Sequence, residues 1–198
     1  MTIKGVLFAV LFAFSSVLYA ADIDGKFAVK GAGRKACADF MQAKSSGSND
    51  YLLYAGWVEG FLSSYNQFQP KNYDITPWQT TELLLLLVSE QCKATPDSRM
   101  LSVVNGLLKA LFSIRLQTES DIVKVSLDGR ETYYYSEILK RVKSRLKIAT
   151  NYKGDEKSDS FGAEEIIAIV NFQKKMGLTV TRVLDQNTLS RLFLKPSK

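Results

Sequence analysis

The sequence predicts a mainly α-helical chain with an N-terminal helical bundle, one short β-hairpin and a C-terminal group of three helices. Apolar residues recur at helical spacing through residues 34–115 and again from residue 136 onward. Between these segments, residues 119–135 alternate apolar and polar side chains around Asp128-Gly129. This dipeptide is favoured in two-residue hairpin turns because both positions must accept a positive φ.

The first twenty residues have the layout of a secretory signal peptide. Lys4 precedes an apolar run from Gly5 to Phe14, and small residues follow at Ala20 and Ala21. The alternative is an uncleaved anchor, but this run is shorter than the roughly 20 apolar residues that a spanning helix needs. We therefore expect cleavage after Ala20 and a periplasmic or secreted protein that does not span a membrane once processed.

The cysteine content predicts a disulfide. Cys37 and Cys92 are the only cysteines in the sequence, and in an oxidising compartment two thiols usually pair. A two-cysteine metal site would need two further ligands, and the sequence offers none at suitable spacing. We therefore expect a structural Cys37–Cys92 disulfide, with no metal and no cofactor.

Four helices are expected in the N-terminal part, at residues 33–44, 51–68, 78–92 and 97–115. Pro77 and Pro96 fall near helix starts, where the missing N–H of proline is tolerated. The run of leucines at 83–87 is too short to span a membrane, which favours a buried central helix that the disulfide ties to the first one.

The hairpin is expected to connect the two helical parts. It ends in a run of three tyrosines, in which alternation places Tyr133 and Tyr135 on one face and Tyr134 on the other. This division favours packing roles for the tyrosines over a continuous aromatic platform.

Three helices are expected in the C-terminal part. The first covers residues 136–149, with Ser136 as its N-cap. The second covers residues 163–177 and is expected to end with Gly177 in the left-handed conformation. Asp185 is expected to cap the third helix.

Five short motifs follow one another along these helices: Tyr152-Lys-Gly154, Phe161-Gly162, Ala168-Ile169-x-x-Phe172-Gln173, Gly177-Leu178 and Val183-Leu184-Asp185-x-x-Thr188-Leu189-x-x-Leu192. In their order and spacing they resemble the peptidoglycan-binding-like three-helix module found on many cell-wall enzymes. The resemblance covers about residues 136–195 and implies that fold. Because such modules are usually accessory wall binders, the resemblance implies peptidoglycan as the ligand. Some members of the family serve only in packing or protein contacts.

Arg182 departs from the pattern of this family, which has glycine at the corresponding place in the link before the last helix. Arg182 either strains the turn or places a cation beside the ligand surface. The resemblance also implies exposed ligand contacts near the loops and two core residues, Phe172 and Leu189. The expected ligand contacts are Tyr152, Arg182, Asn187 and Arg191.

The N-terminal part carries a second set of features: Cys37, Trp57-x-x-Gly60-Phe61-x-Ser63-x-x-Asn66 and Cys92-x-x-x-Pro96. Here it resembles small exported helical proteins with one disulfide, which include immunity proteins of type VI secretion systems. Gly60 is consistent with close helix packing. A partner groove is one interpretation of Trp57, Tyr65 and Asn66, and the other is that all three hold the bundle together.

Catalysis is not expected. The sequence contains no histidine, which excludes Ser/His/Asp and Cys/His triads and every zinc site that includes histidine. The carboxylate pairs Asp155/Glu156 and Glu164/Glu165 are adjacent in the chain, so they cannot face one substrate across a cleft as a glycosidase requires.

The formal net charge is +6, and most of the excess lies after residue 115. It is concentrated in Lys140, Arg141, Lys143, Arg145 and Lys147. Such a run is usually a solvated helix face, and the alternative is a binding patch. It would attract nucleic acid, but the export signal excludes that partner. The carboxylates of peptidoglycan stem peptides suit a basic, partly aromatic surface.

Together these features predict an exported, non-catalytic envelope protein. We expect a signal peptide at 1–20, the disulfide-bonded bundle at 21–115, the hairpin connector at 116–135 and the peptidoglycan-binding-like module at 136–198. The module would bind peptidoglycan, while the bundle would bind a protein partner, either an envelope protein or a secreted effector. The alternative is a periplasmic immunity or inhibitor protein that blocks an enzyme or effector.

Overall fold

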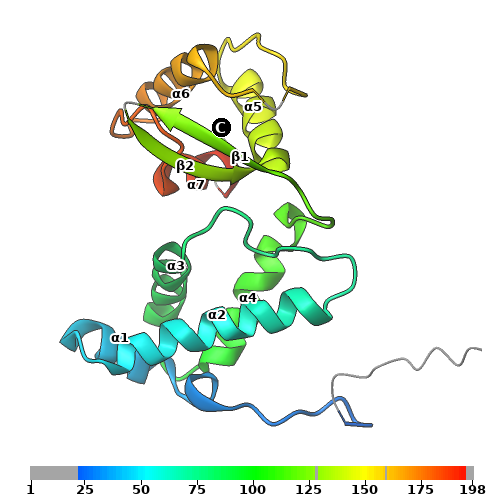
Figure 1. Cartoon of the computed structure of the whole chain (residues 1–198). Helices are drawn as coiled ribbons and strands as arrows, with labels where there is room; N and C mark the ends of the chain where they lie inside the picture. Colours follow the sequence, from blue (N-terminus) through cyan, green and yellow to red (C-terminus); the bar gives the residue numbers. More distant parts are fainter. Residues whose placement is uncertain (1–21, 128, 159, 195–198) are drawn as a thin grey trace, which may run out of the picture.

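The computed structural model describes residues 22–127, 129–158 and 160–194. Within these residues the chain forms seven α-helices and one antiparallel hairpin, which are arranged in two lobes (Figure 1). One lobe contains α1 to α4, and the other contains the hairpin with α5 to α7. The mainly α-helical fold class is confirmed, including its N-terminal bundle, short hairpin and C-terminal three-helix unit.

The N-terminal lobe is a four-helix unit that follows a short 3-10 turn. Its elements are η1 (Gly31–Arg34), α1 (Cys37–Ser46), α2 (Asp50–Phe68), α3 (Thr81–Ala94) and α4 (Met100–Leu111), with η2 (Phe112–Ile114) at its end. The helices enclose a core in which Phe40, Met100 and Leu108 are almost inaccessible to solvent. Each fully buried side chain of this kind contributes about 1.5–3 kcal/mol. The Cys37–Cys92 disulfide joins α1 to α3 and confirms the predicted pairing.

The start predicted for the third helix is wrong. The helix begins at Thr81 rather than at Trp78, and the Thr80 hydroxyl accepts a hydrogen bond of 3.3 Å from the Leu83 N–H as its cap. Trp78 is buried in the core of the other lobe, so the chain crosses between the lobes before the helix begins. The apolar character of Trp78 was therefore misread as part of a helical pattern.

The hairpin consists of β1 (Ile122–Leu127) and β2 (Arg130–Tyr135). Leu127 pairs with Arg130, so the turn has the predicted two residues. Gly129 has a φ of +77°, while Asp128 lies outside the described residues. Apolar hairpin side chains pack against the C-terminal core, namely Val123, Val125, Tyr134 and Tyr135. Tyr133 is exposed.

The C-terminal lobe contains α5 (Ser136–Ala149), α6 (Ala163–Lys175) and α7 (Gln186–Phe193). Gly177 has a φ of +65°, which confirms the predicted left-handed stop after α6. Asp185 is confirmed as the cap of α7, because its Oδ1 accepts a hydrogen bond of 2.8 Å from the Thr188 N–H.

The predicted N-cap role of Ser136 is wrong. Tyr135 occupies that position, since β2 runs directly into α5. The first N–H groups of the helix are paired by the preceding segment instead: Ser136 donates to the Asp121 carbonyl at 2.8 Å, and Glu137 donates to Ser120 Oγ at 3.0 Å. The prediction assigned to Ser136 a role that Ser120, in the segment before β1, fulfils through its side chain.

The two lobes meet in a seam formed by the segment before α3 and by α7. The side chain of Gln186 donates to the Trp78 carbonyl at 2.8 Å and accepts from the Thr80 N–H at 3.1 Å. The Trp78 ring stacks on Phe193 with 5.5 Å between ring centroids. Trp78 and Leu116 both belong to the hydrophobic core of the C-terminal lobe. The C-terminal core is therefore completed by residues from outside its own three helices.

Across the described ranges, no helix is both long enough and apolar enough to cross a bilayer. In the leucine run of α3, Leu84 and Leu85 are buried, whereas Leu86 is 49 % exposed. The run thus lies on a helix with one buried face and one open face.

Candidate functional site

A cavity of about 190 Å³ lies between the hairpin and the link before α7. We call it the hairpin pocket. Its lining is mostly apolar and includes two arginines: Val125, Leu127, Arg130, Thr132, Tyr134, Phe161, Ile166, Arg182, Val183 and Leu184. The Tyr134 hydroxyl donates to the Leu184 carbonyl at 3.1 Å and thereby fixes the hairpin on the link.

Gln173 on α6 holds the other side of this link. Its side chain is fully buried, and Nε2 donates to Thr181 Oγ1 at 2.9 Å, to the Val183 carbonyl at 3.1 Å and to Thr188 Oγ1 at 2.9 Å. Its Oε1 accepts the N–H groups of Thr181 and Arg182, each at 3.1 Å. A single amide thus satisfies the polar groups of the turn and sets the course of the backbone along the pocket.

Arg182 has a φ of +67°, in the left-handed region that disfavours a residue with a Cβ. Its side chain is exposed and lines the hairpin pocket. The turn is therefore strained, as the first interpretation predicted, and Arg182 lies at a pocket; its place beside a ligand surface stays a prediction.

In the same lobe, α5 carries a lysine that solvent does not reach. Lys143 Nζ donates to the carbonyls of Ser158 at 2.7 Å, Ser160 at 2.5 Å and Asp155 at 3.5 Å. Glu165 Oε1 lies 3.9 Å from the same nitrogen. The buried ammonium thus organises the loop between α5 and α6.

Tyr152 belongs to the same buried network, and its predicted place as an exposed ligand contact is wrong. It is 7 % exposed, and its hydroxyl donates to Glu165 Oε1 at 2.5 Å. Burial, followed by this hydrogen bond, raises the pKa of Tyr152 above its usual value. A Cβ at Gly154 would lie 2.3 Å from the Tyr152 hydroxyl, so the Tyr-Lys-Gly motif permits tight packing rather than ligand contact.

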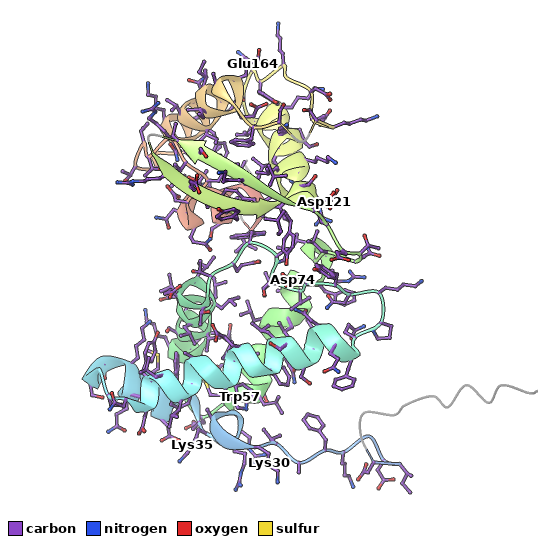
Figure 2. The ribbon with its side chains drawn as sticks, in the orientation of Figure 1. Lys30, Lys35, Trp57, Asp74, Asp121 and Glu164 are labelled. Carbon is purple, nitrogen blue, oxygen red and sulfur yellow. A yellow bond between two sulfur atoms is a disulfide. The ribbon has the colours of Figure 1, made fainter. Side chains whose placement is uncertain are left out.

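Glu165 is held ionised by its surroundings. Burial alone would raise the pKa of Glu165, but hydrogen bonds from the Tyr152 hydroxyl and the Gly162 N–H, together with the charge of Lys143, lower it below the usual value. The adjacent Glu164 is exposed, and Figure 2 shows it at the outer end of the lobe. The two carboxylates therefore occupy unlike environments, one buried in a network and one at the surface.

The basic run on α5 does not form one continuous surface. Lys143 is buried, Arg141 bonds to Glu137 at 3.0 Å and to the Ile114 carbonyl at 2.7 Å, and Lys147 pairs with Glu156 at 2.9 Å. Only part of the run faces solvent, so the expected solvated face is wrong in part. The run was misread because Lys143 lies one helical turn from both Leu139 and Leu146, on the buried stripe.

The remaining predicted ligand contacts lie on α7. Asn187 is exposed and Arg191 is half-buried, one turn further along the same face. Neither residue lines the hairpin pocket. The structure therefore places Arg182 at the pocket, Asn187 and Arg191 on a separate helix face, and Tyr152 in the interior.

The N-terminal lobe contains a larger concavity, of about 760 Å³, between α1 with its preceding turn and the first half of α2. We call it the bundle groove. Its lining residues are Gly31, Ala32, Lys35, Asp39, Gln42, Ala43, Ser46, Ser48, Asp50, Leu53, Tyr54 and Trp57. Figure 2 shows Trp57 on the side of α2 that faces Lys35.

The predicted groove of Trp57, Tyr65 and Asn66 does not form as one surface. Asn66 follows Trp57 by about two and a half helical turns, which places it on the opposite side of α2. Its Oδ1 accepts the Ile75 N–H at 2.9 Å and the Asn72 amide at 2.9 Å, so it holds the following loop. Tyr65 packs against the core of the lobe. Of the three, only Trp57 lines the bundle groove.

Gly60 does not serve close helix packing, because a Cβ built there would have no neighbour within 4 Å. The close approach occurs at Gly33 instead, where a Cβ would lie 2.1 Å from the Trp57 ring. Since φ is ordinary at Gly33, the requirement for glycine there comes from the indole that covers it.

Comparison with protein families gives one match. Residues 135–192 match the family described as a putative peptidoglycan binding domain. The match runs from the end of β2 to α7, so it covers the three helices and excludes nearly all of the hairpin. No curated protein and no solved structure matches the chain. The C-terminal lobe thus contains a peptidoglycan-binding domain, as its motifs predicted.

Proposed function

We propose that the chain is an exported, non-catalytic envelope protein. The premise is the peptidoglycan-binding domain at residues 135–192. Its C-terminal lobe holds peptidoglycan, and its N-terminal lobe holds a protein partner. The family match carries the wall-binding half of this proposal. The disulfide supports export, because such bonds persist in oxidising compartments.

The hairpin pocket supplies the chemistry for wall binding. Stem peptides of peptidoglycan present carboxylates beside small apolar side chains. Arg130 and Arg182 provide guanidinium groups, which bind carboxylates in a bidentate manner. Val125, Leu127 and Phe161 provide apolar surface in the same cavity. We therefore assign the stem peptide to this pocket.

The non-catalytic role is supported by how the acidic groups near the pocket are used. Glu165 is bonded to Tyr152 in the interior, and Glu156 pairs with Lys147. One member of each predicted carboxylate pair is thus used in a contact within the lobe.

The first test is sedimentation of residues 21–198 with purified sacculi. We expect the chain to sediment at low salt and to be released progressively as salt is added, because exposed charge interactions are screened over about 10 Å at 0.1 M salt. If the chain stays in the supernatant when it is mixed with sacculi at low salt, the wall-binding half of the proposal is wrong.

Arg182→Gly tests the pocket itself. We expect the free energy of unfolding to rise by about 0.5–1 kcal/mol, because glycine accepts the left-handed backbone that arginine occupies. Affinity for sacculi should fall several-fold because one guanidinium is lost from the pocket. Urea unfolding and a sacculus binding isotherm measure the two effects.

The chain provides a matched control in Lys71, which is the other non-glycine residue with a positive φ among the described residues, at +54°. Lys71→Gly relieves the same kind of strain and removes one positive charge, but it lies in the N-terminal lobe. It should leave sacculus affinity unchanged. If Arg182→Gly also stabilises the chain without weakening wall binding, Arg182 does not contact the ligand.

The bundle groove favours one second candidate, an immunity or inhibitor protein that blocks an enzyme or effector. The groove has a volume of about 760 Å³, and its lining combines charged residues such as Lys35 and Asp39 with apolar ones such as Leu53, which suits a polypeptide segment. Under this alternative the C-terminal lobe forms part of the same protein interface, and the chain does not bind sacculi. The sedimentation experiment therefore separates the two candidates.

A further inference from the structure

Half of the lining of the hairpin pocket comes from an element that lies outside the family match. Five of its ten lining residues lie on the hairpin, ahead of the matched residues 135–192: Val125, Leu127, Arg130, Thr132 and Tyr134. The other five lie inside the match, around the start of α6 and in the link before α7. The turn end of the hairpin lies beside the start of α6 (Figure 1). The pocket is therefore a feature of this chain and not of the matched helices alone.

The charge of the pocket favours an anionic ligand group. Arg130 lies on β2 and Arg182 on the link, so the two cations come from different elements of the lining. Among the described residues that line the pocket, none is acidic. A guanidinium offers a fork of N–H donors that matches the two oxygens of a carboxylate. A carboxylate is therefore favoured over an ammonium or an uncharged group.

The volume of the pocket limits how much of a ligand it takes. At about 190 Å³ it is smaller than the roughly 300–1,000 Å³ of sites that enclose a drug-sized ligand. One or two residues with small side chains suit this volume, whereas a glycan strand does not. Val125, Leu127 and Phe161 offer apolar surface to methyl groups rather than hydrogen-bond partners to sugar hydroxyls. The pocket thus suits the end of a peptide that carries a carboxylate beside a methyl group.

The two sides of the pocket are held together by hydrogen bonds within the chain. The Tyr134 hydroxyl donates to the Leu184 carbonyl at 3.1 Å, which joins the hairpin to the link. Gln173 accepts the Arg182 N–H and donates to the Val183 carbonyl, each at 3.1 Å. The strained backbone of Arg182 is thereby kept in place, and strain of this kind clusters at ligand sites. A preformed pocket lowers the ordering cost of binding.

We propose that the hairpin pocket binds the C-terminal residue of an uncross-linked stem peptide. The free carboxylate accepts hydrogen bonds from Arg130 and Arg182, and the methyl group of the terminal alanine lies against Leu127 and Phe161. The donor peptide of a cross-link offers no such carboxylate, because its terminal carboxyl group has become an amide. This inference rests on the wall-binding half of the proposed function and names the part of the ligand that the pocket takes.

The test uses residues 21–198 and two capped dipeptides, acetyl-D-alanyl-D-alanine as the free acid and as its C-terminal amide. The backbone amides of Thr132 and Val183 are followed by NMR, and those of Phe40 and Leu108 in the N-terminal core serve as internal references. The acid should shift the pocket signals in a saturable manner and leave the references unchanged. The amide should bind at least about ten-fold more weakly, since it lacks the charge-assisted hydrogen bonds.

Arg130→Gln removes one guanidinium and keeps a polar side chain at an exposed position of β2. It should weaken binding of the acid about ten-fold and leave binding of the amide unchanged, so the preference for the acid is lost. Arg145→Gln is the charge-matched control, since Arg145 is exposed on α5 and does not line the pocket. It should leave both affinities unchanged. A variant that merely loosened the lobe would weaken acid and amide alike.

A protein C terminus is the other source of a terminal carboxylate beside a methyl group. Acetyl-L-alanyl-L-alanine tests it, because inverting the terminal residue moves its methyl group away from the apolar wall. The L-acid should bind more weakly than the D-acid. If it binds as tightly or more tightly, the pocket does not select the stem peptide and the assignment is wrong.

Equal binding of the acid and the amide by the parent chain would overturn this inference, as would an unchanged preference for the acid in Arg130→Gln. The free acid at saturating concentration should also release the chain from sacculi, and the amide should not. If the chain sediments with sacculi at low salt but does not distinguish acid from amide, it binds the wall through another group. In that case the proposed function stands and the assignment of the terminal carboxylate is wrong.

Discussion

Replacing Lys143 by methionine is expected to lower the free energy of unfolding by about 3–5 kcal/mol. Methionine matches the length of the aliphatic chain but removes the ammonium that pairs with Glu165 and three backbone carbonyls. The Glu165 carboxylate would then be buried beside a tyrosine without its cation. Urea unfolding followed by circular dichroism measures the loss.

The matched control is Lys147→Met, one turn further along α5. Lys147 pairs with Glu156, but the lysine side chain is 52 % exposed. The same substitution there should change the free energy of unfolding by about 0–1 kcal/mol, since solvent screens such a pair. Adding Glu165→Gln to Lys143→Met should cost less than Glu165→Gln alone, because the charge that needed the lysine is gone. Equal effects at Lys143 and Lys147 would contradict the buried network.

Removing the disulfide is expected to have an effect of similar size. The Cys37–Cys92 bond closes a loop with a sequence separation of 55 residues. In the chain-entropy description, a loop of this length corresponds to about 4 kcal/mol. The double variant Cys37→Ala/Cys92→Ala should lose about this much in urea unfolding, and the parent chain should lose a similar amount after reduction.

The two ways of breaking the bond control for each other, because the alanine variant also removes two buried sulfur atoms and reduction does not. A loss well below 1 kcal/mol in both experiments would show that the unfolded chain gains little freedom from opening the loop. Sacculus binding of the alanine variant should remain intact below its unfolding midpoint, since the disulfide lies in the other lobe.

The fold could be predicted where local chemistry decides the structure. Gly177 ends α6 because it adopts the left-handed backbone conformation that the turn after this helix requires, and Asp185 caps α7 through its own side chain. The two-residue hairpin turn follows from a dipeptide that accepts positive φ. Each of these features depends on residues close together in the sequence.

The errors arose where distant residues determine the role of a side chain. Trp78 appeared to begin a helix because its partner, Phe193, lies far along the chain. Lys143 was predicted to be exposed because its side chain is charged. Its helical spacing from Leu139 and Leu146 places it on the buried face of α5, and this spacing was the signal for burial. Tyr152 appeared to be a ligand contact because nothing in the sequence reveals its bond to Glu165. Gln173 was read as a family marker, and its five hydrogen bonds became visible only in the folded link.

The seam between the lobes limits how freely this wall-binding unit could be exchanged between proteins. Trp78 and Leu116 belong to the hydrophobic core of the C-terminal lobe, but they lie outside the matched residues 135–192. Recombination at the edges of the match would transfer the helices without these two side chains and would leave Gln186 without its partners, while Phe193, which stacks on Trp78, lies one residue beyond the match. The folded unit is therefore larger than the matched segment, and the contacts of Trp78 and Gln186 fix the bundle in one orientation relative to the C-terminal lobe.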